Sequence, residues 1–424
     1  MGAGADIVQD TEAGDGSSIP LTLGFIPLVD CAPLVVAKEK GFAAAEGLAL
    51  SLVRETSWAN IRDRVMLAHF DAAQMLGPMP IASTLGIGHI AAPMIAPFSL
   101  GLGGNAITVS PEIFAEMSAA GASLNSAPSE MGRALADVIS RRHERGGAPL
   151  TLAVVHPFSG HNYELRYWLA AAGIDPDRDV RINVLPPSAM MGGVRDRQID
   201  GFCVGEPWNS LAVEAEAGVI VVTKSALWRQ GPEKVLGFRA DFAERCPERI
   251  AALVRAVYKA ADWAGRSENH SELSQMLAAT NYLAISAEII LRALSGHLVR
   301  IQGGPPERIP DFLVFNAHAA NFPWQSHSLW FYSQMVRWGQ ISYSPALAEK
   351  ARRVYRPDLY RSALAATGID LPRASAKVEG ALTVATPVAS RNGTMVLGPD
   401  GFFDGRLFDP DEIAAYLKSF DVQI

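Results

Sequence analysis

The chain is poor in cysteine and in charged residues, and each shortage excludes some classes of protein. Three cysteines, Cys31, Cys203 and Cys246, stand far apart among 424 residues. An odd number without a CxxC pair argues against a disulfide framework and a thiolate zinc site, so we expect each to be a small buried side chain. Charged residues make up 19%, hydrophobic residues 49%, and the net charge is −7. This balance suits a chain with a large core, and it is unsuited to wrapping nucleic acid or docking on an anionic membrane.

Two long segments lack charges of one or both signs. Residues 1–20 contain four acids and no lysine or arginine. A secretory signal needs a basic start and then roughly 7–15 apolar residues, so we expect a flexible polar arm over residues 1–20 and a cytoplasmic protein. Residues 72–111 contain no Asp, Glu, Lys or Arg. Repeated glycine and proline break this stretch, which predicts short buried strands and turns rather than a membrane span.

The sequence also lacks the motifs of common enzymes. It has no GxxxxGK[ST] loop, no HExxH and no GxSxG. Residues 101–106 fit G-x-G-x-x-A, but they precede a strand-like run, so no helix start would receive a pyrophosphate. No nucleophile stands beside a base, and no carboxylates are paired at catalytic spacing. We therefore expect no catalytic residue, no metal site and no cofactor, and binding without turnover.

What the chain does contain is an alternation of apolar runs and amphipathic segments. Ser57 is a suitable N-cap for one predicted helix, and Gly41 stands where another would end. The order strand, helix, strand, helix, strand predicts an α/β fold with a mainly parallel sheet. These elements are expected over residues 21–28, 32–40, 48–53, 57–70 and 71–76.

The alternation begins again after residue 105 and gives way to long helices after residue 247. A glycine-rich run at 101–104 predicts the crossing between two lobes, with a return crossing near Gly237. We assign residues 21–103 and 237–424 to lobe 1 and residues 104–236 to lobe 2, with a ligand cleft between them. The later strands are expected at 106–110, 150–155, 180–185, 201–204 and 219–223, and the helices at 126–145, 160–172, 188–198, 249–264, 271–280, 287–295 and 328–337.

Several ordered blocks between Leu21 and the C-terminus carry a family resemblance. They include GFIPLVDCAPLVVAKEKGF, SWANIRDRV, DAAQMLGPMP, GGNAITVS, HPFSGHNYELRYWL, DGFCVGEPWN, PEKVLG and NFPWQSHSLWFYSQMVRWG. Together they resemble the nitrate/bicarbonate family of ABC-transporter substrate-binding proteins. The resemblance implies the type II periplasmic-binding-protein fold, with two α/β lobes around a cleft for a small anion and a helical C-terminal extension packed on the first lobe.

Within that family, a chain without an export signal resembles the cytosolic nitrate/nitrite sensors of the NasS type. The resemblance implies a partner, a NasT-type antiterminator with an RNA-binding ANTAR domain. The resemblance further implies that the ligand-free sensor sequesters this partner, and that nitrate or nitrite releases it to control nitrate-assimilation genes. The alternative is the substrate-binding component of a nitrate/nitrite or bicarbonate ABC transporter whose export signal has been removed. A third reading is an enzyme related to pyrimidine-precursor synthases, but the motif of those enzymes is missing.

Two residues that match the family's anion site stand at the starts of predicted helices. Trp58 follows Ser57 and offers an indole N–H, and His161 follows Ser159 and offers a ring N–H. The free N–H groups and the dipole at a helix start favour an anion. Taken alone, such a tryptophan suits the core equally well, and a lone histidine is more often a structural hydrogen-bonding group. The resemblance assigns both to the ligand.

Asn105 and Lys234 stand near the two predicted crossings, and Lys234 matches the family's anion-pairing lysine. Asn105 can donate an amide proton, while Gly103 and Gly104 let backbone N–H groups come close. An asparagine here is also a common turn residue. Lys234 follows a proline turn, and the resemblance implies that it pairs with the anion, although most lysines lie on the solvated surface.

The weaker candidates for the ligand site are Ser57, Ser159, Glu206 and Trp208, of which the last two stand in the block GEPWN. A carboxylate repels an anion, so Glu206 is expected to orient Lys234 or to bond the backbone. Trp208 is expected to wall the cleft or to pack the hinge. The leading residues all donate, which favours nitrate or nitrite over bicarbonate, because the bicarbonate hydroxyl needs an acceptor.

Overall fold

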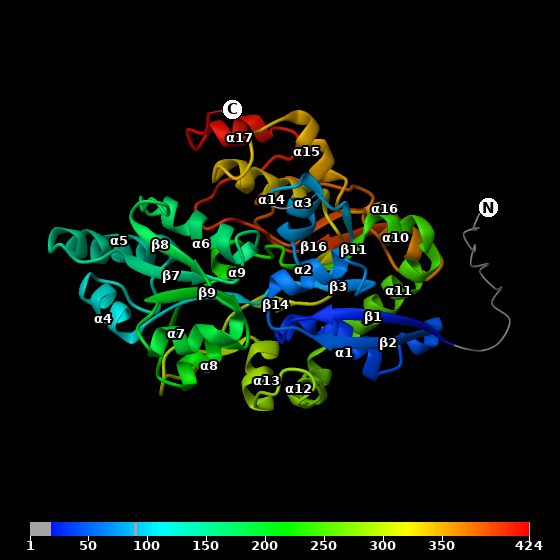
Figure 1. The fold of residues 1–424 in the computed structure, drawn as a ribbon, viewed down its shortest axis with the longest axis horizontal. Helices are drawn as coiled ribbons and strands as arrows, with labels where there is room; N and C mark the ends of the chain where they lie inside the picture. The colour runs from blue at the N-terminus through cyan, green and yellow to red at the C-terminus, as the bar shows by residue number, and fades with distance from the viewer. Residues whose placement is uncertain (1–17, 89–90, 424) are drawn as a thin grey trace, which may run out of the picture.

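Each lobe is built on a five-stranded sheet, and both sheets have the same strand order. The computed structural model describes residues 18–88 and 91–423. The order is β2-β1-β3-β11-β4 in lobe 1 and β8-β7-β9-β6-β10 in lobe 2. Figure 1 shows lobe 2 on the left and lobe 1 on the right. The strands are β1 (Ile19–Phe25), β2 (Leu48–Arg54), β3 (Ala72–Leu76), β4 (Met94–Ser99), β6 (Asn105–Val109), β7 (Leu150–Val154), β8 (Val180–Val184), β9 (Gly201–Gly205), β10 (Val219–Thr223) and β11 (Lys234–Arg239).

Both sheets are mixed, whereas the sequence predicts a mainly parallel one. The strand β1 runs parallel to β2 and β3, and β7 runs parallel to β8 and β9. The strands β11 and β6 run antiparallel to both of their neighbours. Each of these two is the first strand of its sheet that the chain forms after crossing from the other lobe. The crossing therefore delivers one reversed strand to each sheet.

Helices flank both sheets, and most lie where the sequence predicts them. The helices α1–α3, α10 and α11 pack in lobe 1, and α4–α9 pack in lobe 2. Their bounds are α1 (Ala32–Glu39), α2 (Trp58–Met66), α3 (Pro78–Leu85), α4 (Pro111–Ala119), α5 (Pro128–Glu144), α6 (Gly160–Ala171), α7 (Met190–Arg195), α8 (Trp208–Glu214), α9 (Lys224–Leu227), α10 (Ala240–Arg245) and α11 (Pro247–Ala264).

Two predictions for residues 57–100 are wrong. The second predicted helix ends at Met66 rather than near Phe70, and Ala68 then takes a φ of +60°. The uncharged stretch after residue 72 contains the helix α3 as well as strands. Its prolines, Pro78 and Pro80, lie in the first helical turn, where no backbone N–H group has a partner within the helix.

The predicted arm over residues 1–20 overlaps the first strand. Ile19 and Pro20 belong to β1, whereas the sequence predicts a strand from Leu21. Residues 1–17 lie outside the described residues.

The two crossings between the lobes lie side by side. The first spans residues 100–104, between β4 and β6, and the second spans residues 228–233, between α9 and β11. The Gly103 N–H donates to the Gly231 carbonyl at 3.1 Å. The sequence predicts the return crossing near Gly237, but Gly237 pairs with Ala73 inside the sheet of lobe 1. A side chain at Gly237 would overlap Met75, so this glycine serves packing within the sheet.

The C-terminal half packs on lobe 1, as the resemblance implies, and also reaches lobe 2 from both sides. The helix α16 lies on α11 and β4 of lobe 1, while α13 contacts α8 of lobe 2. On the other side of the molecule, Tyr163 and Tyr167 of α6 donate their hydroxyls to Gln340 and Asp404 at 2.7 and 2.8 Å. Figure 1 shows α12 and α13 below the lobes and α14, α15 and α17 above them.

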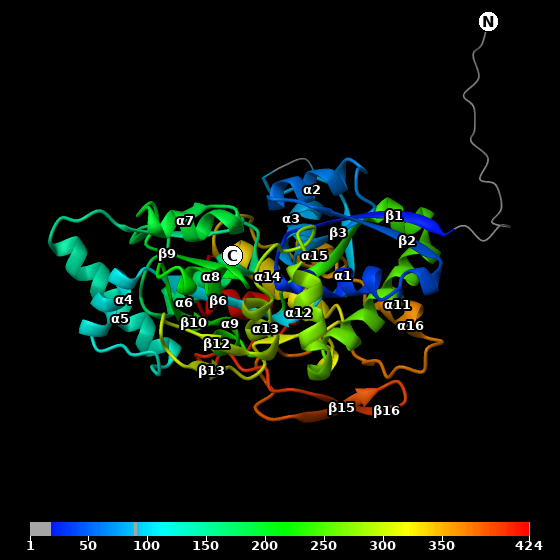
Figure 2. The same cartoon turned by 90° about the horizontal axis from the view of Figure 1, so that it is seen from below.

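The elements of this half are mainly helical. They are α12 (His270–Ala278), α13 (Ala287–Ser295), α14 (Gln325–Arg337), α15 (Pro345–Arg352), α16 (Pro357–Leu364) and α17 (Ile413–Lys418), with the short strands β12 (His297–Val299), β13 (Pro306–Arg308) and β14 (Leu313–Val314). The short strand β5 (Leu102–Gly103) lies outside this half, in the first crossing. The strand β14 pairs with β5 at the first crossing. A hairpin of β15 (Thr386–Ser390) and β16 (Gly393–Leu397) projects from one side, as Figure 2 shows.

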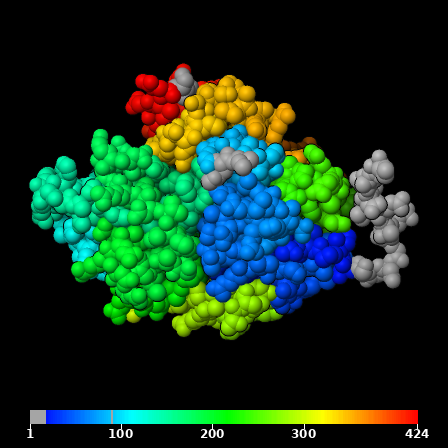
Figure 3. All heavy atoms as spheres, viewed as in Figure 1, coloured from blue at the N-terminus to red at the C-terminus, as the bar shows by residue number. Residues whose placement is uncertain are grey.

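A shared apolar cluster joins the lobes and the C-terminal half. It contains Ile26 and Trp58 of lobe 1, Tyr163 of lobe 2, and Trp330 of α14, all buried. Figure 3 shows the atoms of the two lobes meeting along a seam on one face. The described chain contains no helix with the length and apolar character needed to cross a bilayer. The three cysteines are free, with Cys31 and Cys203 buried and Cys246 half-buried.

Candidate functional site

The four leading candidates meet between the lobes, and each stands near the start of a different element. Trp58 begins α2 and Lys234 begins β11, both in lobe 1, while Asn105 begins β6 and His161 lies in the first turn of α6, both in lobe 2. All four residues are at most 1% exposed. The Lys234 ammonium lies 5.7 Å from the centre of the Trp58 ring, and His161 Nε2 lies 3.1 Å from Asn105 Oδ1.

Glu233 joins the two halves of this group. Its Oε1 accepts a hydrogen bond from Asn105 Nδ2 at 2.5 Å and lies 3.1 Å from Lys224 Nζ, both in lobe 2. Its Oε2 pairs with the ammonium of Lys234. Lys224 Nζ also lies 2.5 Å from Glu164 Oε1 on α6. One carboxylate on the second crossing therefore links the charged groups of both lobes.

On the lobe 1 side, Asp30 is a second counter-ion of Lys234. Asp30 Oδ2 lies 2.9 Å from Lys234 Nζ, and its other oxygen accepts a hydrogen bond from Gln74 Nε2 at 2.5 Å. Gln74 in turn accepts a hydrogen bond from the Ile26 N–H at 2.9 Å. This chain of contacts fixes the Asp30 carboxylate against the ammonium.

Five members of this cluster are not predicted from the sequence, namely Asp30, Gln74, Glu164, Lys224 and Glu233. A signal exists for two of them. Asp30 interrupts the apolar run IPLVDCAPLVV, and Lys224 follows the run VIVVT. A single charge in a segment that must be buried needs a partner in the fold. The partner's identity cannot be read from the segment itself.

The cluster holds three carboxylates and two ammonium groups, so its formal charge is −1 when all are ionised. Burial raises the pKa of Asp30 and of Glu164, against the pull of a neighbouring lysine in each case. Burial also opposes ionisation of Glu233, but Lys224 and Lys234 outweigh it and lower the pKa of Glu233 below its usual value. Burial lowers the pKa of Lys234, but Asp30 and Glu233 reverse this and raise it. Lys234 is therefore charged at neutral pH.

His161 is neutral in this setting. Burial lowers the pKa of His161 to about 3. The Asn105 amide nitrogen is directed at Glu233, so its oxygen faces the ring, and His161 Nε2 must donate the proton between them. His161 Nδ1 is then an acceptor, and it has no hydrogen-bond partner within the described chain. The ring N–H that the sequence predicts for the ligand is used here to orient Asn105.

Trp58 Nε1 is a buried donor that has no hydrogen-bond partner among residues 18–88 and 91–423. Leaving such a group unpaired costs folding free energy, so an acceptor oxygen placed beside this N–H would be stabilising. Lobe 1 thus contributes this N–H and the Lys234 ammonium, and lobe 2 contributes the Asn105 amide and the Lys224 ammonium. Ammonium groups and amide or indole N–H donors are the kinds of group that can bind a small oxyanion.

Gly103 and Gly104 lie at the first crossing, but their N–H groups are used by the protein itself. Gly103 donates to the Gly231 carbonyl, and Gly104 donates to the Phe312 carbonyl at 2.6 Å. Both glycines have positive φ, +76° and +84°, and a Cβ on Gly103 would overlap the Phe312 oxygen. The close approach that the glycines permit is therefore made by the chain near β14.

The two serines cap helices. Ser57 Oγ accepts a hydrogen bond from the Asn60 N–H at 3.3 Å, and Ser159 Oγ accepts one from the Asn162 N–H at 3.0 Å. Ser57 is therefore the N-cap that the sequence predicts for α2, and Ser159 is the N-cap of α6.

Glu206 and Trp208 sit beside the cluster. Glu206 forms hydrogen bonds with the backbone. Its Oε2 accepts a hydrogen bond from the Ser210 N–H at 3.3 Å, and its carbonyl oxygen accepts one from the Val29 N–H at 2.9 Å. Trp208 Nε1 donates to the Pro27 carbonyl at 3.2 Å, which ties α8 of lobe 2 to lobe 1.

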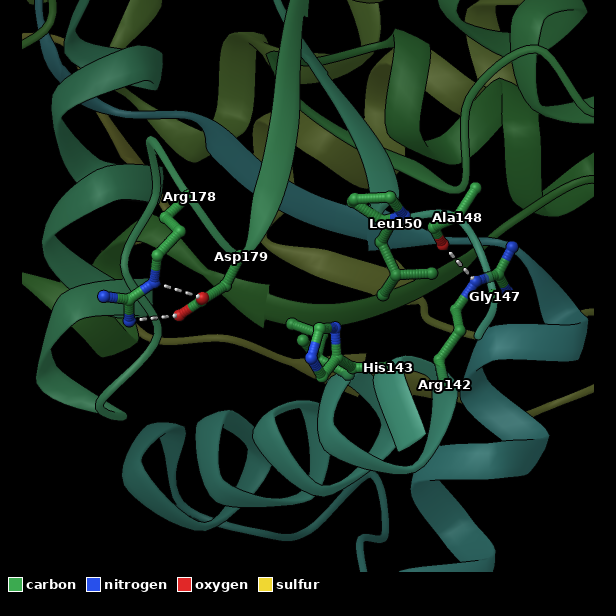
Figure 4. Close-up of a pocket in the computed structure, with 9 residues that line it drawn as sticks. Arg142, His143, Gly147, Ala148, Leu150, Arg178 and Asp179 are labelled. Carbon is green, nitrogen blue, oxygen red and sulfur yellow. Dashed lines mark hydrogen bonds and ion pairs between the residues drawn. The ribbon is translucent and has the colours of Figure 1, made fainter. Parts of the chain in front are cut away.

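A surface pocket of about 280 Å³ lies elsewhere, on lobe 2, and Figure 4 shows its lining. Arg142, His143, Arg178 and Asp179 line it, and none of the site candidates does. Arg178 is paired with Asp179 at 2.9 Å. Across the described residues, no group of three or more His, Cys, Asp or Glu side chains is arranged to hold a metal ion.

Comparison with known proteins identifies relatives over nearly the whole chain. The NMT1-like family profile matches residues 15–278, more than half of the sequence. The nitrate import ATP-binding protein NrtC of Synechocystis is 36% identical over 98% of this chain, which spans 58% of NrtC. The nitrate/nitrite binding protein NrtA of Synechococcus elongatus is 34% identical over 96% of this chain and 87% of NrtA.

A solved structure supports the same assignment. The crystal structure of the periplasmic nitrate-binding protein NrtA from Synechocystis PCC 6803 superposes with a TM-score of 0.82. It is 29% identical in sequence and covers 96% of this chain and 99% of that one. The predicted periplasmic-binding-protein fold is thereby confirmed. The chain belongs to the NMT1-like family and, within it, is a homologue of the nitrate/nitrite-binding protein NrtA.

Proposed function

We propose that the protein binds nitrate or nitrite between its two lobes. The observation that carries this proposal is the meeting of buried donors from both lobes, Trp58 and Lys234 on one side and Asn105 and Lys224 on the other. Nitrate and nitrite are small monoanions whose oxygens only accept hydrogen bonds. An ammonium group and an N–H donor each stabilise such an ion when water is excluded. The relatives named for nitrate binding and nitrate import support the choice of ligand.

A ligand held by donors of both lobes stabilises the closed arrangement over any open one. A partner that contacts both lobes would meet a different surface in the open and closed arrangements. Lobe closure can therefore report ligand binding to such a partner. Trp208, which bonds lobe 1 from α8 of lobe 2, lies at this boundary.

Two roles use that signal. The names of the relatives favour the substrate-binding component of an ABC-type importer, in which the closed form delivers the anion to a transporter. The second role is the cytoplasmic sensor that the sequence predicts, in which the ligand-free form holds a NasT-type ANTAR antiterminator and the anion releases it. Both roles depend on the same anion site.

Calorimetric titration with nitrate, nitrite and bicarbonate tests the binding step. We expect nitrate or nitrite to bind one site per chain and bicarbonate to bind more weakly. Arg142→Ala is the control, because Arg142 lines the surface pocket of Figure 4 and should leave the affinity unchanged. If Arg142→Ala abolishes binding, the anion binds in that surface pocket and not between the lobes. If none of the three anions binds, the proposal is refuted.

The two roles differ in what the ligand does to a partner. For the sensor, nitrate must weaken binding of the antiterminator, measured as loss of a co-purifying complex in a size-exclusion run. For the importer component, the anion-loaded protein must stimulate ATP hydrolysis by a reconstituted transporter, with the antiterminator unaffected.

A further inference from the structure

Glu233 occupies a position that an oxyanion ligand would be expected to fill. Its two oxygens meet the ammonium groups of Lys224 and Lys234 and the amide of Asn105. His161 Nε2 lies 4.0 Å from its Oε2. The donors that the proposed function assigns to nitrate are thus mostly engaged by one side chain of the protein.

The carboxylate also lies against the start of a helix. A Cβ on Gly160, the first residue of the twelve-residue α6, would overlap Glu233 Oε1 and lie 3.2 Å from Glu164 Oε1. Only glycine at this position leaves room for the carboxylate to come so close to the helix. The positive end of a helix dipole favours an anion there, whether it comes from a side chain or from a ligand.

A carboxylate and nitrate are closely alike in shape and charge. Both are planar, delocalised monoanions whose oxygens lie in the plane of the group. Because the cluster already has a formal charge of −1, adding nitrate without other change would bring it to −2 in a buried site. Such an unpaired buried charge is strongly unfavourable. Replacement of one carboxylate by the bound anion avoids this cost, because it keeps the formal charge of the site at −1.

Glu233 is also placed to connect lobe closure to this exchange. Its backbone belongs to the lobe 1 side, since the Gly77 N–H at the start of α3 donates to its carbonyl at 2.9 Å. Its side chain reaches Asn105 and Lys224 of lobe 2. Separation of the lobes would draw the carboxylate away from these donors.

We propose that Glu233 is an internal ligand of the anion site, which holds the lobes together when the site is empty and which nitrate or nitrite displaces. This inference rests on the proposed function. It assigns Glu233 a role in setting affinity, because every binding event includes the release of its carboxylate from three donors. It also gives the ligand-free protein a closed form.

The test compares three variants that each remove one carboxylate charge from the cluster: Glu233→Gln, Glu164→Gln and Asp30→Asn. General electrostatics would tighten nitrate binding similarly in all three. If Glu233 is the competitor, Glu233→Gln tightens binding by about tenfold or more, and by clearly more than the other two. An effect no larger than that of Glu164→Gln or Asp30→Asn would overturn the inference.

A second variant checks the occupied position directly. Glu233→Ala should accept formate in place of the lost carboxylate, so formate should raise its melting temperature and compete with nitrate. Both effects should be clearly weaker in the wild-type protein, where formate must first displace the Glu233 carboxylate. Equal effects of formate on both proteins would contradict the inference.

A wild-type measurement covers the case in which these variants do not fold. Displacement predicts a shift of a carboxylate stretching band in the infrared difference spectrum when nitrate binds, and an unchanged spectrum contradicts it. The two proposals fail differently. If neither the wild type nor any variant binds nitrate or nitrite, the proposed function fails. If the wild type binds but Glu233→Gln binds no tighter, only the internal ligand fails.

Discussion

Replacing Lys234 should separate its structural role from its role in binding. Lys234 is 1% exposed and pairs with Asp30 at 2.9 Å and with Glu233. Lys234→Ala leaves two buried carboxylates without this partner, which typically costs about 3–5 kcal/mol of stability. Loss of a buried charge that pairs with a ligand costs about 2–5 kcal/mol of binding, or about 30-fold to several thousandfold in affinity. Denaturant unfolding measures the first effect and calorimetry with nitrate measures the second.

Lys377 provides a matched control. It is largely buried and pairs with two carboxylates, Glu379 and Asp400, in the C-terminal half. Lys377→Ala should lose a similar amount of stability and keep the affinity for nitrate. In the double variant Lys234→Ala/Asp30→Asn, part of the stability should return while binding stays weak. The reasoning is refuted if Lys234→Ala binds nitrate within threefold of the wild type, or if Lys377→Ala weakens binding as much.

Three further predictions test other parts of the site. Trp58→Phe keeps an aromatic ring but removes the unpartnered indole N–H, so the affinity for nitrate should fall by roughly 10- to 100-fold in calorimetry. Trp338→Phe is the control, because it removes another unpartnered indole N–H away from the site and should leave the affinity for nitrate unchanged. Gly103→Ala should lower the free energy of unfolding by about 3 kcal/mol, because this position combines a positive φ with overlap of the new Cβ on the Phe312 carbonyl. Gly41 has a φ of +72° and open space around it, so Gly41→Ala should cost only about 1 kcal/mol in denaturant unfolding. Equal losses in the two variants would mean that the crossing is not tightly packed. Burial raises the pKa of Glu206 from 4.5 to about 7. Between pH 4.5 and pH 7, the Glu206 carboxyl is therefore protonated in the folded protein and ionised in the unfolded chain. This group therefore removes about 3 kcal/mol of stability as the pH rises from 4.5 to 7, and Glu206→Gln should be the more stable protein at pH 8 but not at pH 4.5; parallel stability curves for the two proteins would contradict it.

Most of the local structure could be predicted from the sequence because its causes are local. Ser57 and Ser159 cap their helices, and the apolar runs form the buried strands. The helix α3 was missed because prolines normally interrupt helices, although Pro78 and Pro80 are tolerated in a first turn. The reversed strand β11 was missed because its direction is decided by the lobe crossing and not by its own residues.

The site was predicted only in part, for a related reason. The resemblance pointed to Trp58 and Lys234, and the structure places them together. Their partners depend on contacts between distant segments, such as the one between Asn105 and Glu233, which are 128 positions apart. Burial of Asp30 shows the same limit, since a lone acid in an apolar run needs a counter-ion whose position only the fold determines.

The two crossings also set the order in which a newly made chain can fold. The sheet of lobe 2 uses strands from one continuous stretch, β6 to β10, so it can form as soon as that stretch has been synthesised. The sheet of lobe 1 cannot, because β11 lies between β3 and β4 and follows β4 by 135 residues, from Ser99 to Lys234. At roughly 5–20 residues per second, the ribosome needs about 7–27 s to make that stretch. During this time the facing edges of β3 and β4 have no strand to pair with, and this is when a chaperone that binds exposed strands would matter most to the protein.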